Sequence, residues 1–407
     1  MTAASPQRWV SAPVNYTISC LLALQKQTRR REGTMRKKTS LHELLCRIIS
    51  AASVVLLLVG CSTPAILPTL TPTAATSMPR AVSTSSFTPQ AEKRTDGLSD
   101  QDAATLGSLK KVDDYPLYTM RYDGSLHQRT SSIDGSEWRA RTGPPAWACS
   151  LFAALGDAGN MHYGRNFDWE HSPALLLFTD PPDGYASVSM VDVAYLGFGG
   201  TKASTLTDLP LAERRALLSA PFLPFDGMNE RGLAIGMAAV PPGGMQPDPN
   251  KETIDSLLVI RKMLDQADNV DEALAIFQRY NISMGGGPPI HCLIADRSGH
   301  AALVEFYQGK LIVIPNDKPW HQATNFLRSA VSGSAEGQCW RYDTIYRQLS
   351  RTDGKITLKD AMSLLGNVSQ NSTQWSIMYG MSTGDVNVTM GRQYDNVHTF
   401  HFDLARK

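Results

Sequence analysis

The chain has 407 residues, of which 42% are hydrophobic and 19% charged, and its net charge at pH 7 is +1. This length suits one large domain or two ordinary ones, and the apolar fraction is typical of a folded core. A charge balance so close to neutrality gives no electrostatic reason to expect a nucleic acid partner.

The first predicted element is an export signal. Residues 35–61 start with a basic stretch, continue with an apolar run over 48–59 and end in Leu-Val-Gly-Cys. The apolar run is shorter than the roughly 20 residues of a spanning helix, which favours a secretory signal over an uncleaved membrane anchor. Its end resembles a bacterial lipobox, so we expect a lipoprotein signal peptide over 35–60 and lipidation of Cys61. We interpret residues 1–34 as a mis-assigned start or an extended n-region.

A flexible tether is expected after the signal. Residues 61–113 are rich in Ser, Thr, Pro and Ala, and such a composition cannot bury enough apolar surface to fold. Residues 114–148 form a propeptide segment in this interpretation, with a docking strand in "YPLYTMRYDG". A lipid on Cys61 would anchor the chain at the outer side of the cytoplasmic membrane or in the cell envelope.

Strand and helix patterns fill the rest of the chain. Two helices are expected within 254–280, broken near 268–270, and two more within 338–350 and 357–368. Strands at both ends with helices between them favour an α+β or layered α/β fold, and no nucleotide-binding glycine motif is present. The runs with strand character are 147–155, 185–198, 232–240, 290–296, 300–307, 310–315, 373–380, 385–391 and 397–404.

Among the six cysteines, Cys149 in "GPPAWACSLF" is the candidate nucleophile. The six contain no CxxC pair, which argues against a zinc ribbon or a thioredoxin-type site. A free thiol has a pKa of about 8.5 and needs an activating base. His291 and His321 lack the context of a papain-type histidine. If Cys149 were the first residue, its own α-amine, with a pKa of about 7.7–8.0, would serve as that base.

The segment after Cys149 predicts a hairpin. "CSLFAALGDAGNMHYGRNFDW" reads as strand, turn over 156–159, and strand, which returns Arg165 and Asp168 toward Cys149. Asp168 could orient the amine or thiol, and the Arg165 charge would lower the thiol pKa. A structural salt bridge between Arg165 and Asp168 is the alternative.

Two asparagines are candidate oxyanion donors, because a side-chain amide can stabilise a tetrahedral intermediate. Asn229 lies in "FDGMNERGLAIGM" and Asn325 in "WHQATNFLRS". Asparagine also favours turns, so each residue has a structural alternative.

In this order the motifs, from about Tyr115 to Phe402, resemble the choloylglycine hydrolase family of linear amide carbon–nitrogen hydrolases. This family includes bile salt hydrolases, penicillin V acylases and relatives of the isopenicillin-N acyltransferases. The resemblance implies an α+β fold, namely a four-layer αββα sandwich of the N-terminal nucleophile hydrolase type. It implies a small-molecule N-acyl amide substrate and neither a metal nor an organic cofactor.

The resemblance also implies roles for individual residues. Cys149 corresponds to the nucleophile, with Arg165 and Asp168 beside it. Asn229 and Asn325 correspond to the oxyanion hole. "CWRYDTIYRQL" carries a further active-site arginine, which is Arg341 here.

The sequence departs from the bile salt hydrolases because 148 residues precede Cys149. We therefore expect self-cleavage between Ala148 and Cys149. Transfer of the acyl group to an amine, a catalytically dead ligand-binding lipoprotein and a papain-like peptidase are the alternatives. The sequence leaves open which amide is the substrate, whether the propeptide stays bound, whether a homo-oligomer forms, and whether Cys292 and Cys339 are bridged.

Overall fold

The computed structural model describes residues 97–126, 148–285 and 287–405. The predicted signal peptide, Cys61 and most of the predicted tether lie outside these ranges. No helix within them has both the length and the apolar character needed to cross a membrane.

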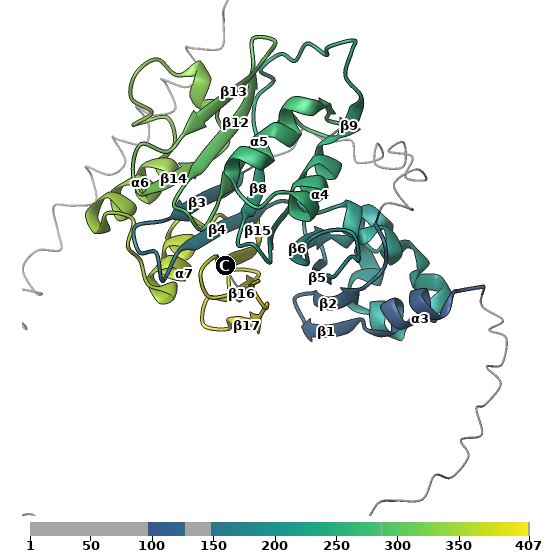
Figure 1. Cartoon of the computed structure of the whole chain (residues 1–407). Helices are drawn as coiled ribbons and strands as arrows, with labels where there is room; N and C mark the ends of the chain where they lie inside the picture. The colour runs from purple at the N-terminus through teal and green to yellow at the C-terminus, as the bar shows by residue number, and fades with distance from the viewer. Residues whose placement is uncertain (1–96, 127–147, 286, 406–407) are drawn as a thin grey trace, which may run out of the picture. The chain divides into compact units, whose positions relative to one another are not determined.

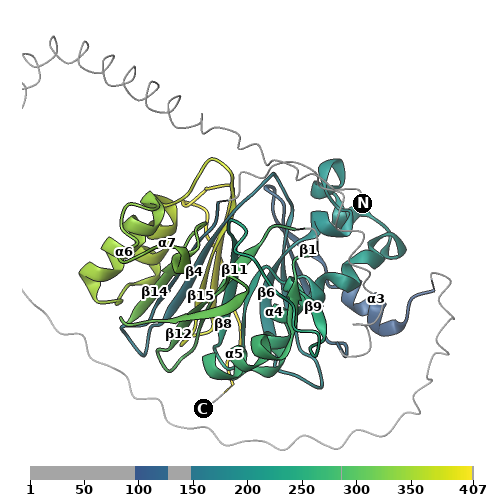
Figure 2. The same cartoon turned by 90° about the horizontal axis from the view of Figure 1, so that it is seen from above.

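Two stacked β-sheets form the centre of the described part (Figures 1 and 2). The first has nine strands in the order β1-β2-β5-β6-β7-β8-β11-β12-β13, and the second has six in the order β14-β3-β4-β15-β16-β17. The strands of the first sheet are β1 (Lys110–Asp113), β2 (Leu117–Tyr122), β5 (Ala174–Thr179), β6 (Ser187–Asp192), β7 (Asp226–Asn229), β8 (Ala234–Ala239), β11 (Ile290–Ala295), β12 (Ala301–Tyr307) and β13 (Lys310–Pro315). Those of the second are β3 (Ser150–Ala154), β4 (His162–Asp168), β14 (Trp320–Ala323), β15 (Thr373–Gly380), β16 (Asp385–Met390) and β17 (His398–His401).

Helices cover the outer face of each sheet. The pair α4 (Ser256–Gln266) and α5 (Val270–Arg279) packs on β7, β8 and β11 of the first sheet. The pair α6 (Trp340–Thr352) and α7 (Leu358–Asn367) packs on β3, β4, β14 and β15 of the second sheet (Figure 2). The layers therefore follow the order αββα, and the predicted fold class is confirmed.

The remaining elements are short. The strands β9 (Thr253–Asp255) and β10 (Asn281–Ser283) form a separate parallel pair beside α4. Helix α3 (Asp100–Gly107) packs on β2 and on 3₁₀ turns over 211–222. Further 3₁₀ turns span 193–196, 200–204, 206–208 and 328–330.

Polar side chains fix where the helices begin. Asp255 accepts a hydrogen bond from the Leu257 amide at the start of α4, and Asn269 accepts one from the Glu272 amide at the start of α5. Thr357 caps α7 in the same way. These side chains satisfy amides that the helix itself leaves unpaired, which explains why the chain breaks between α4 and α5 where the sequence predicts it.

The core has two parts, separated by the six-stranded sheet. On β3, Leu151 and Ala153 belong to the large core that includes the space between the sheets, as does Cys149 just before the strand. Phe152 and Ala154 point the other way, into a smaller core under α6 and α7. Because strand side chains alternate between the faces of a sheet, the position of Cys149 relative to β3 fixes its direction.

The predicted boundary of the tether at residue 113 is corrected by α3 and β1. Leu106 on α3 is fully buried, and β1 pairs with β2 in the nine-stranded sheet. Folded structure therefore begins before residue 113. The sequence pattern does not predict the short helix, because only Leu98, Leu106 and Leu109 supply large apolar side chains in an otherwise polar stretch. Strand β5 was also missed, since a continuous apolar run has no alternation to identify it.

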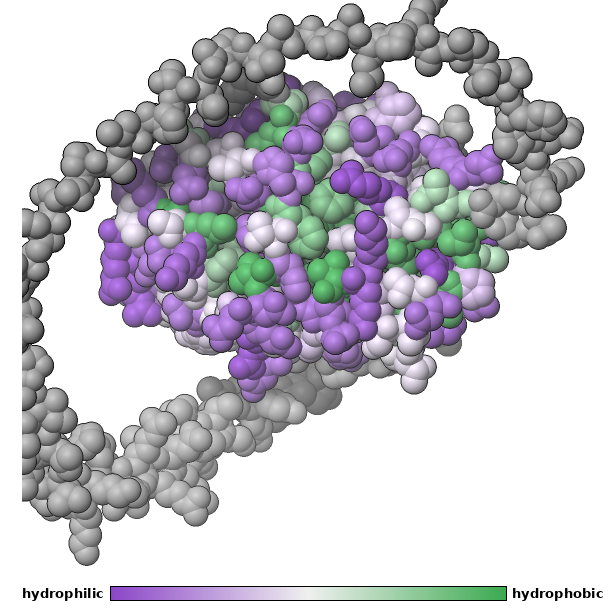
Figure 3. Space-filling model, turned by 90° about the horizontal axis from the view of Figure 1, so that it is seen from below, coloured by the Kyte–Doolittle hydropathy of each residue, from purple (hydrophilic) through white to green (hydrophobic). Residues whose placement is uncertain are grey.

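The outer surface shows small apolar groups among polar side chains on the face in Figure 3. Scattered apolar side chains on a surface are ordinary and carry no conclusion about function. The large hydrophobic side chains that are exposed in the described part are Met245, Trp340, Tyr346 and Val397.

A close approach between the sheets at Gly236 yields a first prediction. A Cβ atom on Gly236 would lie 2.9 Å from both Leu151 Cδ2 and the Tyr163 hydroxyl oxygen. Gly236→Ala should therefore lower the free energy of unfolding by about 1–3 kcal/mol, because neither neighbour can move without disturbing the core. Urea unfolding of both proteins measures the difference.

Gly107→Ala is the matched control. Gly107 ends α3, and a Cβ there would have no neighbour within 4 Å. Helix propensity predicts an unchanged or slightly higher stability, by up to about 1 kcal/mol. Equal stability of the two variants would contradict the close packing between the sheets.

Candidate active site

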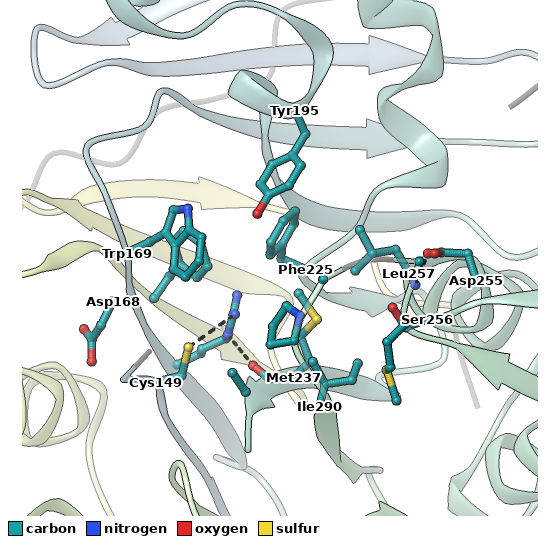
Figure 4. A pocket seen from close by; sticks show the side chains of 17 residues that line it. Cys149, Asp168, Trp169, Tyr195, Phe225, Met237, Asp255, Ser256, Leu257 and Ile290 are labelled. Atoms are coloured by element: carbon teal, nitrogen blue, oxygen red, sulfur yellow. Dashed lines mark hydrogen bonds between the residues drawn. The ribbon is translucent and has the colours of Figure 1, made fainter. Parts of the chain in front are cut away.

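Cys149 lies directly before β3 and faces the inter-sheet space, with 5% of its surface exposed. The antiparallel pairing of β3 with β4 sets Leu151 opposite Arg165. Arg165 Nη2 lies 3.8 Å from Cys149 Sγ (Figure 4). The predicted hairpin is therefore present, and it brings this arginine beside the thiol.

Arg165 is fully buried, and besides the thiol it has two polar partners, Asp226 and the Met237 carbonyl group. Its guanidinium forms an ion pair with Asp226, and its Nε donates to the Met237 carbonyl oxygen at 3.1 Å. The Tyr379 hydroxyl donates to the other Asp226 oxygen at 2.5 Å. Asp226 is a site residue that the sequence reasoning missed. The available signal was the expectation that an arginine inside a buried strand needs a carboxylate partner.

The Asn325 side chain joins the backbone of Cys149 to neighbouring elements. Its Oδ1 accepts hydrogen bonds from the Cys149 backbone nitrogen at 2.7 Å and from Arg341 Nη2 at 2.9 Å. Its Nδ2 donates to the Ala239 carbonyl oxygen at 2.7 Å. Two donors on one side and a carbonyl on the other define the orientation of the amide.

Arg341 fixes the start of β3 from the helix side of the sheet. Its Nη1 donates to the Cys149 carbonyl oxygen and, at 3.0 Å, to the Ser150 hydroxyl. The same nitrogen lies 3.9 Å from an Asp168 carboxylate oxygen. Arg341 thus contacts the backbone of the candidate nucleophile and two other predicted site residues.

Asp168 ends β4 and lines the same pocket as Cys149. Its carboxylate accepts hydrogen bonds from the Thr373 hydroxyl at 2.5 Å and from Gln370 Nε2 at 2.8 Å. Burial raises the pKa of the Asp168 carboxyl, although these hydrogen bonds and the Arg341 charge lower it in part.

The prediction that Asn229 donates to an oxyanion is corrected. Both hydrogens of its side-chain amide are committed, to the carbonyl oxygens of Leu264 at 3.1 Å and Ala267 at 2.8 Å. Its Oδ1 accepts from the amides of Arg231 and Leu233 within the turn. Asn229 therefore closes a turn and satisfies carbonyls at the C-terminal end of α4, and it does not line the pocket around Cys149.

Burial raises the pKa of the Cys149 thiol above its ordinary value, although the Arg165 charge and the Asp168 amide lower it in part. The thiol is consequently protonated at neutral pH in the intact chain. A thiolate nucleophile at this position needs a base, because the protein environment alone does not ionise the sulfur.

A pocket opens beside the thiol, with about 720 Å³ of empty space that is partly open to solvent (Figure 4). Trp169, Tyr195 and Phe225 form one wall, and Leu257 and Ile290 lie across from Cys149 (Figure 4). The lining also includes Phe167, Met284 and Pro288. Four other aromatic residues in the segments 169–185 and 196–225 do not line the pocket, namely Phe178, Tyr185, Phe198 and Phe222.

The described residues contain no group of three His, Cys, Asp or Glu side chains placed to hold a metal ion. Cys149, Cys292 and Cys339 are free thiols, so the bridge left open between Cys292 and Cys339 is absent. Burial raises the pKa of Cys292 to about 12. Cys149 is the only one of these three that lines the pocket.

Two stacked sheets lie between helical layers, and Cys149 directly precedes an inner strand of the second sheet. Residues 149–326 match the family model described as "Linear amide C-N hydrolases, choloylglycine hydrolase family". The match begins at the candidate nucleophile. The family resemblance given by the motifs is therefore confirmed over these residues, and the chain is an amidase acting on linear amides.

Two solved structures are similar to the chain at low identity. A variant of conjugated bile acid hydrolase from Clostridium perfringens has 16% identity and a TM-score of 0.45, over 63% of this chain and 92% of the other. Penicillin V acylase from Agrobacterium tumefaciens has 14% identity and a TM-score of 0.44, over 63% of this chain and 88% of the other. A search of curated proteins found no match.

The buried ion pair beneath the thiol yields a second prediction. Asp226→Asn would leave the Arg165 guanidinium buried without a counter-charge. The free energy of unfolding should fall by about 3–5 kcal/mol, as expected when one partner of a buried pair is removed. Urea denaturation monitored by tryptophan fluorescence measures this loss.

Asp268→Asn provides the control, because Asp268 pairs with Arg231 at the surface, where the two side chains are 37% and 28% exposed. Such a pair contributes at most about 1 kcal/mol. If both variants lost the same stability, the Arg165 pair would not have the structural importance assigned to it.

Proposed function

We propose that the chain hydrolyses N-acyl amides through a thioester on Cys149, after the peptide bond between Ala148 and Cys149 has been cut. The observation that carries this proposal is the hydrogen bond from the Cys149 backbone nitrogen to Asn325 Oδ1. It holds the nitrogen of a future α-amine in place beside the sulfur and at the mouth of an apolar pocket. An N-terminal cysteine at this position would carry both nucleophile and base.

Self-cleavage would proceed by an N-to-S shift. The Cys149 sulfur bonds to the Ala148 carbonyl carbon, the carbon–nitrogen bond breaks, and the thiol proton ends on the released amine. Water then hydrolyses this thioester to give the Ala148 carboxylate and a free Cys149 thiol. Ala148 is small and only partly buried, which leaves room for the attack.

Turnover repeats the same chemistry on an external amide. The α-amine takes the thiol proton, the sulfur attacks the substrate carbonyl, and the amine product leaves with the transferred proton. Water releases the acid and regenerates the thiol. Asn325 has a second Nδ2 hydrogen for the oxyanion, while Arg341 and Asp168 hold the backbone of Cys149 and its surroundings in position.

The segment before the cleavage site would stay bound. Strand β2 pairs in parallel with β5 from Leu117 to Tyr122. The Tyr118 hydroxyl donates to the Ala203 carbonyl oxygen at 2.8 Å, and the Tyr115 hydroxyl donates to Gln374 at 2.9 Å. A lipid on Cys61 would then anchor the assembled enzyme at the outer side of the cytoplasmic membrane or in the cell envelope, as the lipobox-like sequence indicates.

The third prediction concerns Cys149 itself. Intact-mass spectrometry of active protein should find a chain that begins at Cys149. Cys149→Ala should remain uncut and lose at least about 10³-fold in kcat/KM on N-acyl amides, since nucleophile and base are both removed. Cys292→Ala, which removes a buried thiol away from the pocket, should still be cut and active.

The alternatives give different results in the same assays. Active protein in which Cys149 remains joined to Ala148 would refute the proposal. Acylated amine as the main product, when an amine competes with water, would indicate a transferase. A cut protein whose Cys149 reacts with iodoacetamide no faster than in the intact chain would indicate an inactive ligand-binding protein.

A further inference from the structure

The pocket has a polar end that the catalytic chemistry does not use. Asp255 and Ser256 lie at the side away from Cys149, with apolar side chains such as Phe225, Leu257 and Ile290 between (Figure 4). Arg165 is the single cationic residue among those that line the pocket, and it is paired with Asp226. The negative charge of Asp255 therefore has no cationic neighbour in the pocket lining.

Asp255 is held rigidly at this place. It follows β9 directly and caps α4, with Oδ1 accepting the Leu257 amide at 2.8 Å. Its Oδ2 lies toward Gly285, where an added Cβ would come within 2.8 Å of this oxygen. Gly285 has a φ of +63°, so both its backbone conformation and the space beside the carboxylate favour glycine.

Ser256 adds a hydroxyl beside the carboxylate. Its residue surface is 8% exposed, and it lines the pocket next to Asp255. Asp255 and Ser256 together thus offer hydrogen-bonding capacity at the far end of an apolar pocket.

We propose that Asp255, assisted by Ser256, determines which acyl group the enzyme accepts. The preferred acyl group has an apolar body and a hydrogen-bond donor, a hydroxyl or an ammonium, at the end remote from the scissile amide. Acyl groups that end in a carboxylate are disfavoured. This inference rests on the proposed function, since it assumes that the acyl group of an amide fills the pocket next to Cys149.

The physical reason is the low polarity around the carboxylate. Burial raises the pKa of Asp255, although the amides at the start of α4 lower it in part. A donor from the substrate would replace lost hydration of the charged oxygen and form a charge-assisted hydrogen bond. A second carboxylate at the same place would be repelled, and its own hydration would be lost without compensation.

The test uses the processed enzyme and a series of N-acyl amides of one amine. The acyl chains have equal length and end in methyl, hydroxyl, ammonium or carboxylate. The wild type should hydrolyse the hydroxyl- or ammonium-ended amide with a kcat/KM about 10-fold to 100-fold above that of the carboxylate-ended one, as expected for a hydrogen bond to a charged group.

Asp255→Asn should reduce this selectivity ratio by about 10-fold or more, because it removes the charge. Asn and Ser cap helices about as well as Asp, so Asp255→Asn and Asp255→Ser both retain the start of α4. Thermal unfolding checks that both variants are folded. Asp248→Asn is the matched control, since Asp248 accepts a backbone amide in a nearby turn and does not line the pocket. It should keep the wild-type ratio.

Equal rates for the hydroxyl- and carboxylate-ended amides in the wild type would overturn the role of Asp255. An unchanged ratio in both folded Asp255 variants would also overturn it. In either case, hydrolysis of the methyl-ended amide leaves the proposed function intact. If processed wild-type enzyme cleaves none of the four amides, the proposed function fails, and the specificity inference fails with it.

Discussion

The buried guanidinium of Arg165 is the interaction on which the rest of the site depends. A positive charge between two sheets is tolerated only with a counter-charge and filled hydrogen bonds. Asp226 and the Met237 carbonyl supply them, and the Tyr379 hydroxyl in turn donates to Asp226. These partners come from β7, β15 and β8, so the charge joins both sheets directly beneath the thiol. Cys149 therefore lies against a positive charge that partners in both sheets hold in place.

The need to bring Arg165 and Asp226 together also explains why β8 carries a small residue, Gly236, between the sheets. The sheets must approach closely enough for a side chain on β4 to reach a carboxylate on β7. Gly236 permits this approach, since any side chain there would meet Leu151 and Tyr163. The packing of the apolar core therefore sets the distance between the sheets, and this distance allows Arg165 to pair with Asp226.

Local patterns predicted those parts of the molecule in which spacing alone fixes geometry. The hairpin after Cys149, the break between α4 and α5 and the αββα class are examples. Asn229 could not be resolved in this way, because an asparagine in a turn looks the same whether its amide faces a substrate or the end of α4. Asp226 was not predicted for a related reason. Its partner Arg165 lies 61 residues earlier in the chain, and only folding brings the two together.

The protonation of Cys149 connects the fold to the proposed chemistry. In the intact chain burial outweighs the attraction of Arg165, and the thiol pKa is raised. The backbone nitrogen already bonds to Asn325, yet as an amide it cannot accept a proton. Under the proposed cleavage the atoms keep their places and only the basicity of that nitrogen changes. A site built in this way can remain nearly unreactive until the chain is cut and can then gain its base without any rearrangement of the sheets.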